Sequence, residues 1–345
     1  MKTLLVGYKV QDLFEGDRRG RKVPAPWLEG DVTCHALDVY HCHAVEKAGL
    51  GVKAVCSPHL PKDEWDLVKF RTGPKLMPGE LSLDLLQEIH LLRPRRFELD
   101  FVGRERDRND LLAKIRDDPD RVRDFSATWP ASVPGGERLL FTSFPGCFCH
   151  RRLDEGGLAL AEVVARELSS NSPLAGRGVS PRRPRPARRA APTSASHSTS
   201  LNILDMGCGC GLVGLLVATS LSRNPSTSQR PLRLVMVDSH ARAVEAASLN
   251  ARKFGVAAEV ILSDTGTPAE MDGTFDVFVG NPPYYSDYRI ADIFLETAKR
   301  ALKAGGVCYT VCKNAAGLEP VQRRLFPDVE IVRRRGYAVL KSAKN

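Results

Sequence analysis

A turn rich in glycine lies in the second half of the chain, at the end of an apolar run. The segment ILDMGCGCGLVGLL at 203–216 carries a carboxylate, Asp205, and then glycines at alternate positions, Gly207, Gly209 and Gly211. Such a backbone can turn sharply and lie against a ligand, so the peptide at Cys208 is expected to contact it as well. The spacing also fits a dinucleotide site with a pyrophosphate at the helix amino end. Asp205 favours a cation there instead, which indicates S-adenosylmethionine.

Two further carboxylates close the next apolar runs along the chain. Asp238, followed by Ser239, ends the run 232–238 and is expected to accept hydrogen bonds from both ribose hydroxyls of a nucleoside. Asp264, preceded by Ser263, ends the next run and is expected to accept from an adenine amine. A single Asp at a strand end is usually a helix cap or a turn former. Three in serial order favour a nucleoside site formed by these residues.

A fourth apolar run leads into the tetrapeptide Asn281-Pro282-Pro283-Tyr284. Two consecutive prolines fix φ and remove two backbone donors, so the Asn281 amide and the Pro282 carbonyl form a rigid pair of acceptors. An exocyclic amine can donate both hydrogens to this pair, which directs its lone pair toward an electrophilic methyl group. Tyr284 is expected to stack on the ring that bears the amine. The alternative is that the tetrapeptide has only a structural role, as a turn at the end of a strand.

Short apolar strands alternate with amphipathic helices from residue 202 onward, which is typical of a parallel α/β sheet. Helices are expected at 241–254 and 290–303, the second ending at the Gly305-Gly306 pair. Strands are expected at 203–206, 232–238, 258–263, 275–279, 307–311, 329–333 and 337–341.

The first 135 residues repeat this order of elements. LDVYHCHAVEKA at 37–48 matches VDSHARAVEAA at 237–247 with one gap, and Trp65 aligns with Phe275. Two tandem Rossmann-like domains are therefore predicted, at 1–135 and 138–345. The first domain lacks the residues that would carry the chemistry. No alternating glycines follow Gly7, and Arg71 aligns with Asn281. We expect this degenerate domain neither to bind the cofactor nor to transfer methyl groups.

Composition places the chain among basic, globular proteins with enough apolar residues for two cores. It is 43% hydrophobic, and 50 Lys and Arg against 41 Asp and Glu give a net charge of +9. Six arginines and no acidic residue lie between Glu167 and Asp205, within a Ser-, Pro- and Arg-rich stretch at 169–200. That stretch is predicted to be a disordered insertion, either an RNA-binding arm or a tolerated surface loop.

Nine scattered cysteines favour reduced thiols in a cytoplasmic protein over a disulfide framework. No uncharged apolar run approaches the length of a membrane span, and we expect neither an export signal nor a membrane partner. The clusters at 35–43 and 147–150 lack the paired spacing of structural zinc ligands, so no metal is expected.

The chain resembles the class I S-adenosylmethionine-dependent methyltransferases that modify amino nitrogens, through the glycine turn after Asp205 and the tetrapeptide at 281–284. More narrowly, FTSFPGCFCHRRLDEGGLALAEVV at 141–164 is similar to the segment PGxFSxxxLDxGTxLLL of the small-type ribosomal RNA guanine-N2 methyltransferases. The resemblance implies a mostly parallel seven-stranded sheet whose last strand is antiparallel, with a degenerate domain ahead of the active one. It also implies a guanine of ribosomal RNA, free or in a subunit, as acceptor.

Three positions depart from that family pattern: Tyr284 replaces the usual Phe, Cys149 the Ser, and Gly157 the Thr. Tyr after the two prolines is also common in enzymes acting on adenine N6 or protein glutamine, so both acceptors remain alternatives. From other classes, a nicotinamide-dependent oxidoreductase and a non-catalytic module that binds RNA during ribosome assembly also remain. The oxidoreductase would need a hydride-transfer site, for which the sequence offers no placed His or Tyr-Lys pair.

Overall fold

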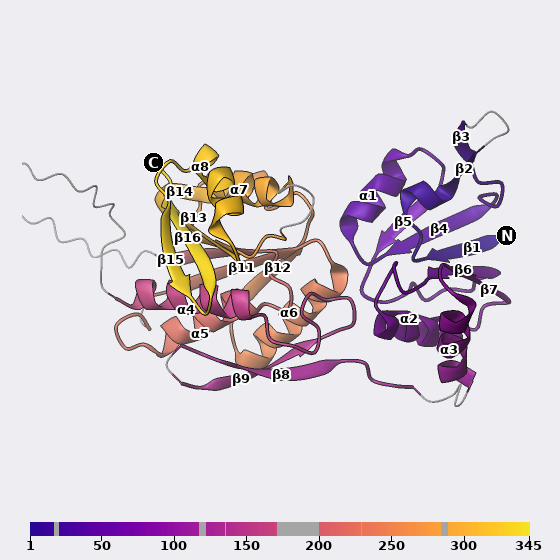
Figure 1. Cartoon of the computed structure of the whole chain (residues 1–345), viewed down its shortest axis with the longest axis horizontal. Helices are drawn as coiled ribbons and strands as arrows, with labels where there is room; N and C mark the ends of the chain where they lie inside the picture. The colour runs from indigo at the N-terminus through magenta and orange to yellow at the C-terminus, as the bar shows by residue number, and fades with distance from the viewer. Residues whose placement is uncertain (17–20, 117–121, 135, 171–199, 229, 284–288) are drawn as a thin grey trace, which may run out of the picture.

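The computed structural model describes residues 1–16, 21–116, 122–134, 136–170, 200–228, 230–283 and 289–345. It comprises two α/β domains that lie side by side and are joined by an extended segment along one edge (Figure 1). The predicted insertion at 169–200 falls almost entirely outside these residues. Helix α4 (Glu155–Ser169) precedes it, and strand β10 (Leu201–Met206) follows it.

The C-terminal domain is built on a seven-stranded sheet with the predicted topology. Its first five strands pair in parallel, and the last strand along the chain inserts antiparallel between the fifth and sixth. The order across the sheet is β12 (Ala258–Leu262), β11 (Leu232–Asp238), β10, β13 (Phe275–Gly280), β14 (Leu302–Cys312), β16 (Tyr337–Ala343) and β15 (Glu330–Arg334).

Helices cover both faces of this sheet and bury its near-continuous apolar strands. On one face, a large apolar core joins the sheet to α4, α5 (Leu212–Arg223) and α6 (Ala241–Phe254). On the other face, α7 (Arg289–Ala301) and α8 (Ala315–Leu325) pack on smaller clusters. The carboxyl ends of β10, β11, β12 and β13 therefore meet at one edge of the sheet, where the predicted site residues lie.

The sequence misplaced the end of the helix at 290–303. Helix α7 ends at Ala301, and β14 begins at Leu302, which pairs with Phe275. The Gly305-Gly306 pair therefore lies within the strand and does not cap a helix. Its backbone bonds to Lys344 instead, and the register of the strand shifts beside it. Tertiary pairing thus outweighs the local helix-stop signal of the two glycines.

The N-terminal domain repeats the parallel part of the fold with five described strands. Their order is β5 (Lys53–Cys56), β4 (Asp31–Ala36), β1 (Lys2–Val6), β6 (Leu67–Thr72) and β7 (Arg96–Phe101). Helix α1 (Val39–Lys47) contacts β4 and β5, while α2 (Gly79–Leu92) packs against α3 (Glu105–Arg116). A 3-10 turn at Val10–Leu13 and the short pair β2 (Phe14–Gly16) and β3 (Lys22–Pro24) follow β1, in the place that α5 takes in the other domain.

A β-hairpin connects the domains but packs with the second one. Strand β8 (Ala127–Ser132) pairs antiparallel with β9 (Arg138–Ser143) along the C-terminal domain (Figure 1). Its alternate residues, Trp129 and Ala131 among them, join the C-terminal core. The sequence assigned residues 127–135 to the N-terminal domain, and we propose that the boundary instead lies before Ala127.

The two domains meet through equivalent corners of their folds. The corner between β4 and α1 faces the corner between β11 and α6, and an antiparallel bridge joins Asp38 to His240. Val39 N–H donates to Ser239 O at 2.9 Å. Beside this bridge, Arg242 is only 2% exposed and binds Pro58 O, Asp84 and Glu88 of the N-terminal domain. The Arg242 charge is buried, and separating the domains would leave it without these partners. The ion pairs therefore hold the two domains in one relative placement.

Candidate functional site

The glycine turn presents its backbone, not its side chains, to an open pocket. Gly207, Gly209 and Gly211 have φ values of 68°, 55° and 86°, a region that L side chains rarely adopt. A Cβ on Gly207 would also lie 2.5 Å from the Phe294 ring, whereas a Cβ on Gly209 would meet no atom within 4 Å. Gly209 therefore borders open space that a ligand can fill.

Cys208 and Cys210 turn into the apolar core beneath this loop, with 6% and 5% exposure. Burial raises the pKa of both thiols well above the ordinary value. Both therefore stay protonated and are poor nucleophiles. The backbone of the turn, Cys208 included, therefore remains the part expected to contact a ligand.

Asp205 is a buried carboxylate at the start of the pocket, 1% exposed. Its Oδ2 accepts from Gly214 N–H at 2.8 Å, in the first turn of α5, so the helix end supports the negative charge. Burial nevertheless raises the pKa of Asp205 to about 7, with smaller contributions from the nearby charges of Asp238 and Asp154. A cation placed here would relieve this repulsion.

Asp238 ties the glycine turn to the end of β11. Its Oδ2 accepts from Gly209 N–H at 2.8 Å and its Oδ1 from His240 N–H at 2.9 Å. Burial raises the pKa of this carboxyl as well. Each oxygen keeps a second lone pair, so the predicted bonds to ribose hydroxyls remain available in addition to these two.

The third of the predicted carboxylates, Asp264, is contacted by the N-terminal domain. The sequence did not indicate this contact. His43 of α1 lies 3.1 Å from Asp264 Oδ2 through its Nδ1. The other oxygen, Asp264 Oδ1, is buried without a hydrogen-bond partner among the described residues. The neighbouring Ser239 hydroxyl donates to Asp38 Oδ2, also of the N-terminal domain, at 3.0 Å, while Ser263 N–H donates to Asp238 O.

Asn281 stands directly after β13 and lines the same pocket as Asp205 and the glycine turn. Its Nδ2 donates to Asp154 Oδ2 at 2.8 Å, which fixes the direction in which the amide faces. Asp154 also caps α4, because its Oδ1 accepts from Gly156 N–H. Pro282 is buried and Pro283 half-buried. Tyr284 lies outside the described residues.

The loop between β9 and α4 supplies Phe148 and Asp154 to the pocket, which the sequence analysis did not single out, and Cys149, which it noted only as a departure from the family pattern. Phe148 is 66% exposed and lines the pocket beside Cys149 and Asp154. Cys149 and Arg151 adopt positive φ values of 54° and 65°, which turns the loop toward the pocket edge. All four residues lie within the segment 141–164, so the resemblance of that segment could have identified them.

These features fit a cationic nucleoside. The pocket joins an open backbone surface at Gly209 to a buried carboxylate at Asp205, and Asp264 offers an unsatisfied acceptor further along the sheet edge. A pyrophosphate would meet three carboxylates near the turn and is disfavoured by their charge.

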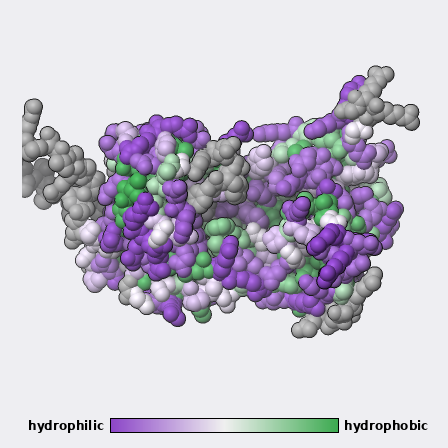
Figure 2. Space-filling view, viewed as in Figure 1, coloured by the Kyte–Doolittle hydropathy of each residue, from purple (hydrophilic) through white to green (hydrophobic). Residues whose placement is uncertain are grey.

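No group of three or more His, Cys, Asp and Glu side chains within the described ranges is arranged to hold a metal ion. Among the described helices, none is both long and apolar enough to cross a membrane. In Figure 2, apolar residues form separate patches within a largely hydrophilic surface.

Comparison with known proteins relates the second half of the chain to one family. Residues 193–341 match the methyltransferase small domain family. The chain is 25% identical over 221 residues to Ribosomal RNA small subunit methyltransferase C of Marinomonas sp., a match that covers 63% of this chain and 53% of that protein. It is 27% identical to the protein of the same name from Pseudoalteromonas translucida, covering 61% and 51%. The chain thus spans about half the length of these curated relatives.

A solved structure shares the fold of the whole chain. It is described as the T. thermophilus 16S rRNA N2 G1207 methyltransferase (RsmC) in complex with AdoMet and guanosine. The TM-score is 0.70 at 16% identity, and the match covers 100% of this chain and 88% of the other. This likeness confirms the predicted tandem α/β architecture.

Proposed function

We propose that this chain, whose residues 193–341 belong to the methyltransferase small domain family, methylates the exocyclic N2 amine of a guanine in small-subunit ribosomal RNA with S-adenosylmethionine as donor. One observation carries the proposal: Asp154 holds the Asn281 amide at 2.8 Å, in the pocket that the glycine turn and Asp205 line. The names of the relatives support ribosomal RNA as the acceptor.

The cofactor would lie along the carboxyl ends of β10, β11 and β12, where it would supply an electrophilic methyl group. Asp205 would hold the cationic amino acid part and thereby regain a stable negative charge. Asp238 would accept from the ribose hydroxyls through its second lone pairs. Asp264, with the orphan acceptor Oδ1, would accept from the adenine amine. The backbones at Cys208, Ser239 and Ser263 would line this groove.

The acceptor amine would be positioned by Asn281 and Pro282. The Asn281 Oδ1 and the Pro282 carbonyl would accept its two hydrogens, which aims the nitrogen lone pair at the methyl group. No strong base is needed, because the nitrogen can lose its proton after transfer. Tyr284 and the exposed Phe148 would stack on the base, each contact being worth about 1–3 kcal/mol. The target base must be unstacked or single-stranded to enter.

We propose that the N-terminal domain does not catalyse. Strand register supports the alignment, because Leu5 pairs with Lys69 as Asp205 pairs with Val279. Leu5 therefore replaces the carboxylate, and Arg71, two residues beyond Lys69, replaces Asn281. The domain instead contributes His43 and Asp38 to the edge of the cofactor groove.

The test is methyl transfer from labelled S-adenosylmethionine to naked ribosomal RNA, small subunits and total protein, followed by nucleoside analysis. We expect N2-methylguanosine with the unchanged chain and with Asn345→Ala, which changes an exposed terminal amide. We expect none with Asn281→Ala, although this variant should still bind RNA.

Each other result contradicts part of the proposal. Label in N6-methyladenosine or in protein glutamine would reassign the acceptor while keeping the cofactor. RNA binding without transfer by the unchanged chain would favour a non-catalytic assembly module. Binding of a pyridine dinucleotide in place of S-adenosylmethionine would overturn the cofactor assignment.

A further inference from the structure

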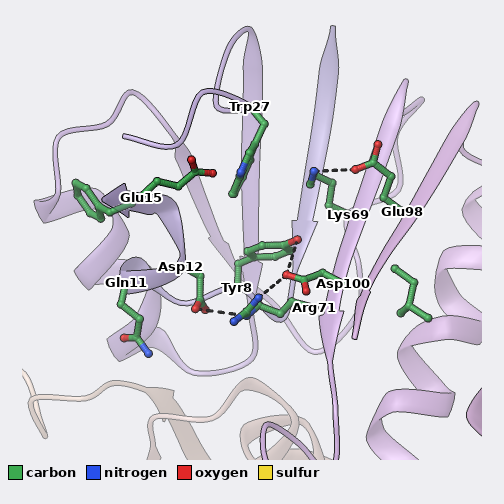
Figure 3. A pocket seen from close by; sticks show the side chains of 11 residues that line it. Tyr8, Gln11, Asp12, Glu15, Trp27, Lys69, Arg71, Glu98 and Asp100 are labelled. Atoms are coloured by element: carbon green, nitrogen blue, oxygen red, sulfur yellow. Dashed lines mark hydrogen bonds and ion pairs between the residues drawn. The ribbon is translucent and has the colours of Figure 1, made fainter. Parts of the chain in front are cut away.

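A cavity of about 410 Å³ lies in the N-terminal domain, away from the site described above. This volume falls within the range of about 300–1,000 Å³ that is usual for small-ligand sites. Figure 3 shows that its side chains come from the strands β6 and β7, from the turn after β1 and from the loop before β4. They include three aromatic residues, four carboxylates and two cations: Tyr8, Phe14, Trp27, Asp12, Glu15, Glu98, Asp100, Lys69 and Arg71.

The floor of the cavity is a row of charged pairs on the face of the sheet. Lys69 pairs with Glu98 across β6 and β7, with Nζ 2.7 Å from Oε2. Two residues along, Arg71 pairs in the same way with Asp100 and also lies 3.4 Å from Asp12. The two cations therefore lie along β6 and the two carboxylates along β7, so that each cation has a carboxylate beside it on the floor.

This charged row occupies positions that carry no charge in the C-terminal domain. Matching strand registers put Lys69 at the position of Val279 and Glu98 at that of Tyr309. In the C-terminal domain, α4 covers this face, and the Tyr309 hydroxyl donates to Glu167 of that helix. In the N-terminal domain, the same face lines a cavity. Charged side chains on the inner face of a sheet are costly unless water or a polar ligand satisfies them.

The walls of the cavity are aromatic. The rings of Tyr8 and Trp27 lie 5.5 Å apart at 60°, and Lys69 Nζ lies 4.9 Å from the centre of the Trp27 ring. Burial and the Asp100 carboxylate raise the pKa of Tyr8, so its hydroxyl remains a donor. Aromatic walls around mixed charges suit a flat heterocycle that carries both donors and acceptors.

We propose that this cavity binds a guanine base. The N1 and N2 hydrogens of guanine donate to one carboxylate, while O6 and N7 accept from Lys or Arg, so its edges match a floor in which a carboxylate lies beside each cation. Four carboxylates against two cations disfavour a phosphate inside the cavity. The base could belong to an unpaired nucleotide of RNA or to free guanosine. Only the RNA form rests on the function proposed above.

The test is photolabelling of the full chain with 8-azidoguanosine, with labelled peptides identified by mass spectrometry. We expect label in peptides spanning residues 8–27, with guanosine competing about tenfold better than adenosine. Glu98→Gln and Trp27→Leu should each lower this label about tenfold. Glu64→Gln, an exposed carboxylate of the same domain, should leave it unchanged, as should Asn281→Ala.

Competition separates the two sources of the base. A single-stranded RNA with guanines that competes better than free guanosine assigns the site to RNA, and the reverse assigns it to the nucleoside. Label confined to the C-terminal domain, equal competition by adenosine, or label insensitive to both Glu98→Gln and Trp27→Leu would overturn the inference. Because methyl transfer is measured separately, loss of transfer with label retained at 8–27 counts against the proposed function alone.

Discussion

Asp205 should make the affinity for S-adenosylmethionine depend on pH. In the absence of ligand, burial raises the pKa of this carboxyl to about 7. A cation favours the ionised form, so binding must remove the proton wherever the carboxyl still holds it. Affinity should therefore rise with pH through the neutral range. Replacement of Asp205 by Asn removes the titrating group while preserving the shape of the side chain.

The size of the effect follows from the pKa. A carboxyl with a pKa of about 7 is roughly 10% ionised at pH 6 and 90% at pH 8, so affinity should rise about tenfold over that range. The stability of the empty protein should change in the opposite direction. A carboxyl whose pKa is raised from 3.8 to about 7 contributes stability that is fully present below pH 3.8 and is lost as pH rises from there to about 7. The total loss is on the order of 4 kcal/mol, of which about 1 kcal/mol falls between pH 6 and pH 8.

Titration calorimetry at pH 6, 7 and 8 measures the first effect, and thermal unfolding without ligand measures the second. The amino group of the ligand also titrates, but it does so equally with every variant, so the difference between the unchanged chain and Asp205→Asn isolates Asp205. Asp328→Asn, at an exposed carboxylate, is the matched control. If Asp205→Asn keeps the same tenfold slope, the carboxylate does not hold the cation and the proposed orientation of the cofactor is wrong.

Three other predictions follow from single contacts. Asp154→Asn should keep the cap on α4 and so leave the melting temperature within about 2 °C. It should slow methyl transfer at least tenfold, because the amide nitrogen that the substitution introduces and that of Asn281 would then face each other. Equal rates would refute the positioning role of Asp154. Arg242→Met removes the only cation among the described residues that pairs with Asp84, so it should cost about 3–5 kcal/mol by denaturant unfolding. Glu88 loses the same partner but keeps Leu60 N–H and His59. Arg233→Met, at an exposed pair, should cost less than about 1 kcal/mol. Gly209→Ala should cost about 1–2 kcal/mol of stability and also weaken cofactor binding in equilibrium dialysis; unchanged affinity would show that the ligand does not approach this backbone.

Periodicity and turn chemistry predicted most of the catalytic fold. The strands of the C-terminal sheet were placed within two residues at most ends, because fully buried parallel strands read as short apolar runs bounded by Gly and Asp. The exceptions depend on contacts between distant segments. Strand β14 begins at Leu302 because it pairs with Phe275, and β8 leaves the N-terminal domain because Trp129 packs in the other core.

The candidate site was predicted to the extent that its residues follow strands in the chain. Asp205, Asp238, Asp264 and Asn281 stand at adjacent strand ends, so topology alone brings them to one edge. Asp154 was missed because it caps a helix that precedes the sheet, and its bond to Asn281 spans 127 residues. His43 was missed because the sequence does not reveal how two domains dock.

The docking suggests why an N-terminal domain proposed to be non-catalytic is retained. In both domains, the corner after the second strand ends in Asp followed by a helix, and these corners are Asp38 and Asp238. In the C-terminal domain, Asp238 accepts from the glycine turn, whereas in the N-terminal domain Asp38 accepts from Ser239 of its partner corner. Both corners therefore form the docking surface, and only the C-terminal one is also proposed to bind a ligand. Loss of the N-terminal domain would expose Arg242 and remove His43 from Asp264, so the catalytic half expressed alone should bind its cofactor more weakly even if it folds.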